Sequence, residues 1–127
     1  MQYTRENAEK VMAGRKTRTW RPYKDGEYAV RNSADDIMLV RNRKQHIKWI
    51  VGRDYAVQPG RGKHAIGRHR ITRIRHEQAG AISEADAIAE GFDDVQGFID
   101  SLTALYGEWT PEQPGWALDF ELVNGSR

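Results

Sequence analysis

Short β-prone runs follow one another closely through the middle of the chain, and turn residues separate them. These runs occupy residues 37–40, 47–51, 55–57 and 70–75, with a weaker one at 28–30. Pro59 and Gly60 stop the third run, as expected of residues that interrupt strands. Several short strands at this spacing favour a small β-barrel.

The clearest strand is predicted at the end of the chain, over residues 116–123. Trp116, Leu118, Phe120 and Leu122 are predicted on one face, and Asp119 and Glu121 on the other. The prediction follows from the geometry of a strand, in which successive side chains point to opposite faces.

Three helices are predicted around the strands. The first covers residues 4–12, with Thr4 as its N-cap and Gly14 just past its end. The second begins after Ser83 and closes at Gly91. The third follows Asp93 or Asp94, ends at Gly107, and has an apolar stripe of Val95, Phe98, Ile99, Leu102 and Leu105. This order indicates the α+β class, and 127 residues fit one domain over residues 1–127.

The composition excludes several kinds of site. No cysteine is present, which rules out disulfides and thiol catalysis and fits a cytoplasmic protein. The four histidines, at 46, 64, 69 and 76, match no ligand spacing, so neither a metal nor another cofactor is expected. The sequence has no apolar run of about 18 residues and no secretory signal, so no membrane association is expected.

The charges are unevenly distributed along the chain. Residues 41–75 carry eleven Lys or Arg and one acid, Asp54, whereas residues 76–126 carry eleven Asp or Glu and no Lys or Arg. A basic patch attracts phosphates and steers polyanions, which favours nucleic acid as a partner. Alternatively, the basic strands pair with the acidic helices, and both interpretations can hold together.

The segment from Gly14 to Arg21 is the first candidate site. It is read as a loop that gathers a lysine, two threonines and three arginines, donors that suit an anion or a polar heterocycle. A desolvated Lys16 can act as a base toward a threonine hydroxyl. The alternative is a solvated loop whose hydroxyls cap the preceding helix.

Two further segments carry candidate ligand-binding cations. Arg61 and Lys63 lie beside glycines at 60 and 62, where the backbone can approach a ligand closely or simply turn. Arg70 and Arg73 lie on the strand at 70–75, whose alternation breaks near residues 72–73 and predicts a bulge. Nearby Trp49 and Tyr55 either stack on bases or belong to the core, and we favour the core for Trp49.

Glu90 is predicted at the end of the second helix, where the helix dipole does not favour an acid. A cationic partner from the basic segments would compensate for this placement. The alternative is an exposed surface glutamate.

Three of these stretches resemble the ASCH domain, a relative of the PUA RNA-binding fold. Residues 11–21 are similar to its "GxKTxTxR" signature, residues 55–63 with 67–75 to its central strand-loop-strand, and residues 82–92 to its "AxxEGF" helix. The final strand also fits, and the likeness is strongest to ASCH proteins of bacteria and their phages. The resemblance implies a small PUA-like β-barrel with flanking helices, in a single ASCH-type domain, and a cleft lined by the first and third motifs.

The resemblance also implies two functions. Many family members are presumed RNA binders, and one bacterial branch consists of amidohydrolases that act on N4-acetylcytidine. The motifs of that branch place a catalytic set on Lys16, Thr19 and Glu90, with Arg21 near the oxyanion. This sequence departs from the branch by extra residues between Pro22 and Tyr55 and by Trp20 in place of a smaller aliphatic residue.

The sequence therefore predicts binding of nucleic acid, most readily RNA, or of a modified nucleoside in a basic cleft. The second hypothesis is an amidohydrolase for acylated nucleosides, and the third is a ribonuclease of the same fold. The candidate ligand-binding residues are Arg15, Arg18, Arg21, Arg61, Lys63, Arg70 and Arg73. No protein partner is indicated.

Overall fold

The computed structural model describes residues 1–123. Its elements are α1 (Arg5–Met12), β1 (Arg18–Pro22), β2 (Tyr28–Arg31), β3 (Ile37–Arg41), β4 (Ile47–Ile50), β5 (Asp54–Val57), β6 (Gly67–Gln78), the 3-10 turn η1 (Ala79–Ala81), α2 (Glu84–Ala89), α3 (Val95–Tyr106) and β7 (Pro114–Leu122). The α+β class is confirmed. The single domain over residues 1–127 stays a prediction, and residues 124–127 lie outside the described part.

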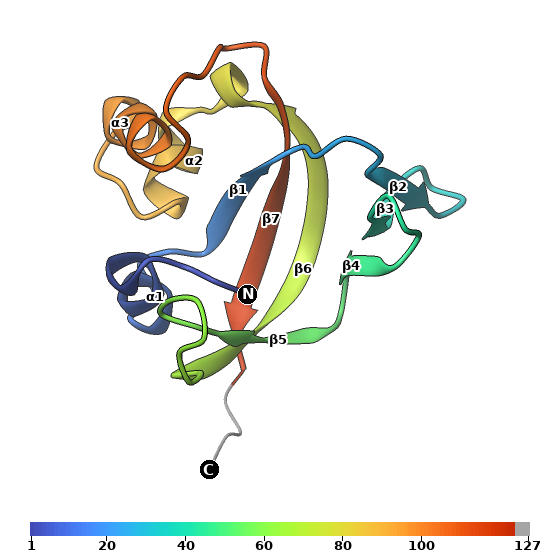
Figure 1. Cartoon of the computed structure of the whole chain (residues 1–127), viewed down its shortest axis with the longest axis horizontal. Coiled ribbons are helices and arrows are strands. Elements are labelled where there is room, and N and C mark those ends of the chain that lie inside the picture. The colour runs from blue at the N-terminus through green and yellow to red at the C-terminus, as the bar shows by residue number, and fades with distance from the viewer. Residues whose placement is uncertain (124–127) are drawn as a thin grey trace.

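One seven-stranded antiparallel sheet organises the molecule. The strand order is β1-β7-β6-β3-β2, with β4 beside β3 and β5 beside β6. Figure 1 shows the long, curved β6 and β7 in the middle, with α1, α2 and α3 on one side and the β2–β3 hairpin on the other. Within residues 1–123 the two end strands, β1 and β2, do not pair, so the barrel-like sheet stays open.

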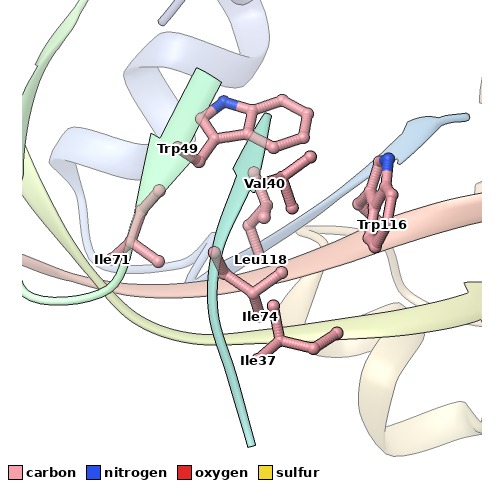
Figure 2. Packing of buried hydrophobic residues seen from close by; sticks show 7 residues of the cluster. All are labelled: Ile37, Val40, Trp49, Ile71, Ile74, Trp116 and Leu118. Atoms are coloured by element: carbon pink, nitrogen blue, oxygen red, sulfur yellow. The ribbon is translucent and has the colours of Figure 1, made fainter. Parts of the chain in front are cut away.

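A bulge in β6 lets this strand supply two core residues three positions apart. The register of β6 against β7 shifts between Ile71 and Arg73, which confirms the bulge predicted near these residues. A bulge adds one residue to one strand, so Ile71 and Ile74 both face inward. Figure 2 shows them packed with Ile37, Val40, Trp49, Trp116 and Leu118.

Two sequence predictions about the core have different outcomes. Trp49 is buried, as predicted. Leu122 was predicted on the same face as Trp116, Leu118 and Phe120, yet it is 40% exposed while those three are buried. Leu122 lies at the end of β7, where it pairs with His69 near the end of the sheet, beyond the packed core.

The helix ends follow their capping residues. The Thr4 hydroxyl accepts from the Asn7 N–H (3.2 Å), the Ser83 hydroxyl from the Asp86 N–H (3.1 Å), and the Asp94 carboxylate from the Gly97 N–H (2.8 Å). None of the helices within residues 1–123 is long and apolar enough to cross a membrane.

The prediction of a loop from residue 15 to residue 21 is wrong for most of that segment. Arg18–Pro22 forms β1, an edge strand that pairs with β7 from Arg18↔Asp119 to Pro22↔Gly115. Polar and apolar side chains do not alternate in this segment, so its sequence did not predict a strand. The segment forms a strand because the backbone N–H and C=O groups along one side of β7 are available to pair with it. This pairing holds the first candidate motif rigidly against the sheet.

Candidate functional site

A cavity of about 260 Å³ lies where β1, the end of α2, α3 and the N-terminal segment meet. It brings together Lys16, Thr19 and Glu90, although Glu90 lies 74 residues beyond Lys16 in the sequence. Its remaining lining residues are Gln2, Tyr3, Thr4, Asn7, Trp20, Arg21, Arg61, Phe92, Phe98, Ser101, Leu102, Leu105 and Tyr106.

Backbone contacts hold Lys16 against the end of α2. After α1, Gly14 adopts a positive φ of 75°, and the Lys16 N–H then donates to the Lys10 carbonyl (3.1 Å). One residue later, the Thr17 N–H donates to the carbonyl of Ala89 (2.8 Å). The segment between α1 and β1 is thereby tied to both helices, and the Lys16 side chain is 3% exposed.

Glu90 is the centre of a buried ion cluster rather than a surface residue. The Lys16 ammonium donates to the Glu90 carbonyl oxygen (2.8 Å) and lies 3.4 Å from Glu90 Oε1. Arg18 Nε donates to Glu90 Oε2 (2.7 Å), and the Trp20 N–H donates to Oε1 (3.1 Å). The expected cationic partner of this helix-end acid is therefore present, and Glu90 is 2% exposed.

Arg18 completes the cluster behind the cavity. Its guanidinium contacts the carboxylate of Glu77 and lies 3.4 Å from Asp86 as well as bonding Glu90. Arg18 is 1% exposed and does not line the cavity. Because its donors face three carboxylates, Arg18 holds Glu90 in place.

Burial changes the pKa of Lys16. Desolvation lowers the pKa of the Lys16 ammonium, while the neighbouring Glu90 carboxylate opposes this shift. A lysine whose pKa is lowered is easier to convert to a neutral amine, the form that accepts a proton.

The Thr19 hydroxyl is positioned by Arg21. Arg21 Nε donates to Thr19 Oγ1 (3.4 Å), and Arg21 Nη2 donates to the carbonyl of Gln2 (2.7 Å). The guanidinium lies over the Tyr3 ring, 5.0 Å from its centroid. Tyr3 therefore acts as a platform that fixes Arg21 at the wall of the cavity.

A buried histidine, His69, holds the Tyr3 ring in place. His69 Nδ1 lies 2.9 Å from the carbonyl oxygen of Tyr55, which can only accept, so Nδ1 carries the proton. Nε2 is then free to accept from the Tyr3 hydroxyl at 2.6 Å. Burial lowers the pKa of His69 below its ordinary value of 6.5 and raises the pKa of the Tyr3 hydroxyl.

This histidine predicts how stability depends on pH. Because the pKa of His69 is lower in the folded state, the unfolded chain binds more protons once the pH falls below about 6.5. Below about pH 6.5 this difference should lower the free energy of unfolding by up to about 1.4 kcal/mol per pH unit. This loss adds to the slope from the N-terminal amine, whose pKa burial also lowers. Urea unfolding between about pH 7.5 and 5.5 measures the combined slope. His46→Gln, a change at an exposed histidine, should keep the slope, and a flat wild-type profile would contradict the lowered pKa of His69.

Aromatic side chains also line the cavity. Trp20 and Phe98 pack edge to face with centroids 6.3 Å apart, and Phe92 packs against Phe98 at 6.2 Å. The Trp20 indole donates to the carbonyl of Glu77 (2.9 Å) and lies directly against Gly115, where a Cβ would come within 2.3 Å of the ring. Glycine at 115 therefore leaves room for the large Trp20 that distinguishes this chain's first motif.

The other predicted ligand-binding residues are dispersed. Arg21 and Arg61 line the cavity, but Lys63 does not. Arg15 pairs with Asp93 (3.0 Å), and Arg70 pairs with Asp54 (2.7 Å) away from the cavity. Arg73 lines a separate, larger hollow of about 560 Å³, which two further arginines (Arg31 and Arg75) and three acids (Asp35, Asp36 and Glu77) also line. Its opposite charges balance, so the smaller cavity with the buried ion cluster is the stronger candidate.

Sequence reasoning missed several residues that line the cavity. Tyr3 and Tyr106 lay outside every motif, and Phe98 was assigned only to the apolar stripe of the third helix, whereas Phe92 belongs to the third motif that the resemblance placed on the cleft. Leu105, which belongs to the apolar stripe predicted for the third helix, is 48% exposed and lines the cavity rather than lying in the core. Within residues 1–123, no group of three or more His, Asp or Glu side chains is arranged to hold a metal ion.

No protein-family model and no curated protein matches the sequence. Solved structures do match its fold. The ASCH domain from Lactobacillus crispatus JV V101 has 17% identity and a TM-score of 0.58, over 92% of this chain and 70% of that one. The chain has an ASCH-like fold. A second match is protein EF3133 from Enterococcus faecalis V583, which is described by the family model DUF984. It has 20% identity and a TM-score of 0.59, over 94% of this chain and 74% of that one.

The ASCH-like fold confirms the resemblance carried by the three sequence motifs. The first and third motifs meet because residues of β1 and the residues Glu90 and Phe92, which follow α2, line one cavity. At these identities the likeness extends to the fold alone, so function rests on the side chains of the site.

Proposed function

We propose that the cavity binds a single nucleobase, presented by a free nucleoside or by an unpaired RNA nucleotide. The observation that carries this proposal is the buried Lys16–Glu90 pair on the wall of a cavity that aromatic side chains also line. A base has a flat face that stacks on aromatic side chains and a polar edge that pairs with donors and acceptors.

The volume of the cavity supports one base rather than a stretch of polymer. At about 260 Å³ it lies just below the range of about 300–1,000 Å³ typical of sites for drug-sized ligands. A base would fill it, and the sugar would remain at the mouth.

The polar groups retain hydrogen-bonding capacity for such a base. The Lys16 ammonium has three donors, and Glu90 uses at most two of them through its carbonyl and Oε1. The Thr19 hydroxyl accepts from Arg21, which leaves its own proton to donate. The cavity can therefore donate to a carbonyl or ring nitrogen on the edge of a base.

Calorimetric titration of the wild-type protein tests this proposal. The probes are N4-acetylcytidine, the four common ribonucleosides and a short single-stranded RNA. We expect saturable one-to-one binding of at least one nucleoside, with an affinity that depends little on salt, because a neutral base releases no counterions. Heat released only with the RNA, and lost steeply as salt rises, would show surface binding of a polyanion instead.

A second candidate function is amide hydrolysis of an acylated nucleobase, favoured by the lowered pKa of Lys16 beside the Thr19 hydroxyl. Neutral Lys16 would take the Thr19 proton while Oγ1 attacks the acyl carbonyl carbon, with Arg21 facing the oxyanion. The C–N bond would then break as Lys16 returns the proton to the leaving amine, and water would hydrolyse the acyl-threonine ester. Lys16 bonds Glu90 rather than Thr19 here, so the transfer requires the neutral amine to turn toward Thr19 or a bridging water.

Chromatography of N4-acetylcytidine incubated with the protein tests this candidate. Thr19→Ala should abolish conversion to cytidine, whereas Thr17→Ala, a change at an exposed threonine two residues away, should preserve it. Conversion that survives Thr19→Ala would remove Thr19 as the nucleophile.

A further inference from the structure

We propose that the ligand carries a phosphate and that Arg61 binds it at the mouth of the cavity. This inference rests on the nucleobase proposal and narrows the ligand class from nucleosides to nucleotides. It follows from the balance of charge around the cavity and from the placement of Arg61.

The lining of the cavity carries more positive than negative charge. Its cations are Lys16, Arg21 and Arg61, and Glu90 is the one acid among the described lining residues. Glu90 is already neutralised by Lys16 and by Arg18 behind the wall. The charges of Arg21 and Arg61 are left for a ligand to balance.

Of these two arginines, Arg61 has fewer contacts with other groups of the protein. Arg21 is committed to the Gln2 carbonyl, the Thr19 hydroxyl and the Tyr3 ring. Arg61 is exposed and makes no ion pair within residues 1–123. It can therefore swing toward a phosphate, for which a guanidinium offers paired donors.

A tight turn presents Arg61 to the cavity. The Lys63 N–H donates to the Gly60 carbonyl (3.2 Å), and Gly62 follows Arg61 with a φ of 71°. Glycine with positive φ at the third position is typical of a type II turn, which leaves Arg61 at its corner. The loop is fixed to the N-terminal segment because the Tyr3 N–H donates to the Gln58 carbonyl (2.9 Å).

A hollow next to the cavity, between α1 and α3, would repel a phosphate. It shares Thr4, Asn7, Phe92, Ser101 and Leu105 with the cavity, and its charged residues are Glu6, Asp100 and Lys10. Lys10 pairs with Glu6 at 3.4 Å, which leaves Asp100 as the unbalanced charge. With the base inside, a phosphate on the sugar is therefore directed toward Arg61.

Calorimetry with matched ligands tests the inference. The probes are cytidine and N4-acetylcytidine, each compared with its 3′- and 5′-monophosphates at low salt. We expect the better monophosphate to bind about ten- to a hundredfold more tightly than its nucleoside, as hydrogen bonds to a charged group imply. Arg61→Gln should reduce that ratio toward one, and Arg53→Gln, at an exposed arginine outside the cavity, should not.

The possible results distinguish failure of the phosphate site from failure of the nucleobase proposal on which it rests. Equal affinity of nucleoside and monophosphates, or a preference that survives Arg61→Gln, overturns the phosphate site and leaves the base pocket standing. No binding of any of these ligands overturns both. If a short oligocytidylate binds more tightly than the monophosphates and depends on Arg61 in the same way, the phosphate is that of RNA. If the oligocytidylate binds more weakly than the monophosphates, the ligand is a free nucleotide.

Discussion

Replacing Glu90 by alanine is expected to lower the free energy of unfolding by about 3–5 kcal/mol, the usual cost of removing one partner from a buried ion pair. The Glu90 carboxylate bonds Lys16, Arg18 and the Trp20 N–H, and both cations are almost completely buried. Without it, Lys16 keeps only the Glu90 backbone carbonyl as a partner. The total free energy of unfolding of a domain is about 5–15 kcal/mol, so this loss should shift the midpoint of urea unfolding to a much lower urea concentration.

Two further variants make this result specific. Glu90→Gln keeps the side-chain volume and an acceptor oxygen, so we expect an intermediate loss. Glu84→Ala removes an exposed acid from the first turn of the same helix and should cost about 0.3–1 kcal/mol through the helix dipole. Equal effects of Glu90→Ala and Glu84→Ala would contradict the buried cluster.

Replacing Lys16 by methionine is expected to weaken nucleobase binding by about ten- to a hundredfold while the protein stays folded. Methionine has a similar length but no donor, so the ligand loses a charged hydrogen bond. Glu90 retains Arg18 and the Trp20 N–H as partners, which is why the fold should tolerate this change better than the loss of Glu90. Titration of N4-acetylcytidine measures the effect, with circular dichroism to verify folding.

Lys44→Met is the matched control for this variant, because Lys44 is exposed and does not line the cavity. It should bind the nucleoside as the wild type does. If Lys16→Met also binds as the wild type does, then Lys16 serves the ion cluster alone and the base does not contact it.

The sequence predicted elements with strong local signals. Caps at Thr4 and Ser83 marked helix starts, and the broken alternation near Thr72 marked the bulge in β6. Glu90 was predicted at a helix C-terminus, where the helix dipole disfavours a negative charge, and no neighbouring residue in the sequence carries a positive charge to offset it. This unfavourable placement indicated a cationic partner far away in the sequence. Such signals arise within a few residues and need no knowledge of the tertiary structure.

The features that were missed depend on contacts distant in sequence. Strand β1 forms because β7 offers an edge, and nothing within residues 15–22 reveals that partner. Arg18 resembles its neighbours Arg15 and Arg21 in sequence, yet only Arg18 lies beneath three carboxylates. Tyr3 joins the site because His69 and Arg21, 66 and 18 residues further along the chain, hold its hydroxyl and ring.

The structure gives the basic middle segment partners other than the acidic helices. Arg70 pairs with Asp54 and Arg75 with Asp119, so some basic residues of the middle segment balance acids of the same sheet. Attraction of a polyanion stays a prediction. Arg61 and Arg73, from the same basic segment, make no such pair within residues 1–123 and flank two different hollows. Only the three-dimensional arrangement separates the cations that stabilise the sheet from those that can meet a ligand.

The cavity between β1, the end of α2 and α3 is the site where we propose that a nucleobase binds. The most direct measurement is a titration of isotope-labelled protein with N4-acetylcytidine, followed by the amide and indole signals in NMR spectra. We expect the shifts to concentrate on Thr19, Trp20, Glu90 and Tyr106, with little change at Asn32, Arg73 and Lys44. Shifts centred on the hollow around Arg73, or no shifts at saturating nucleoside, would contradict the claim.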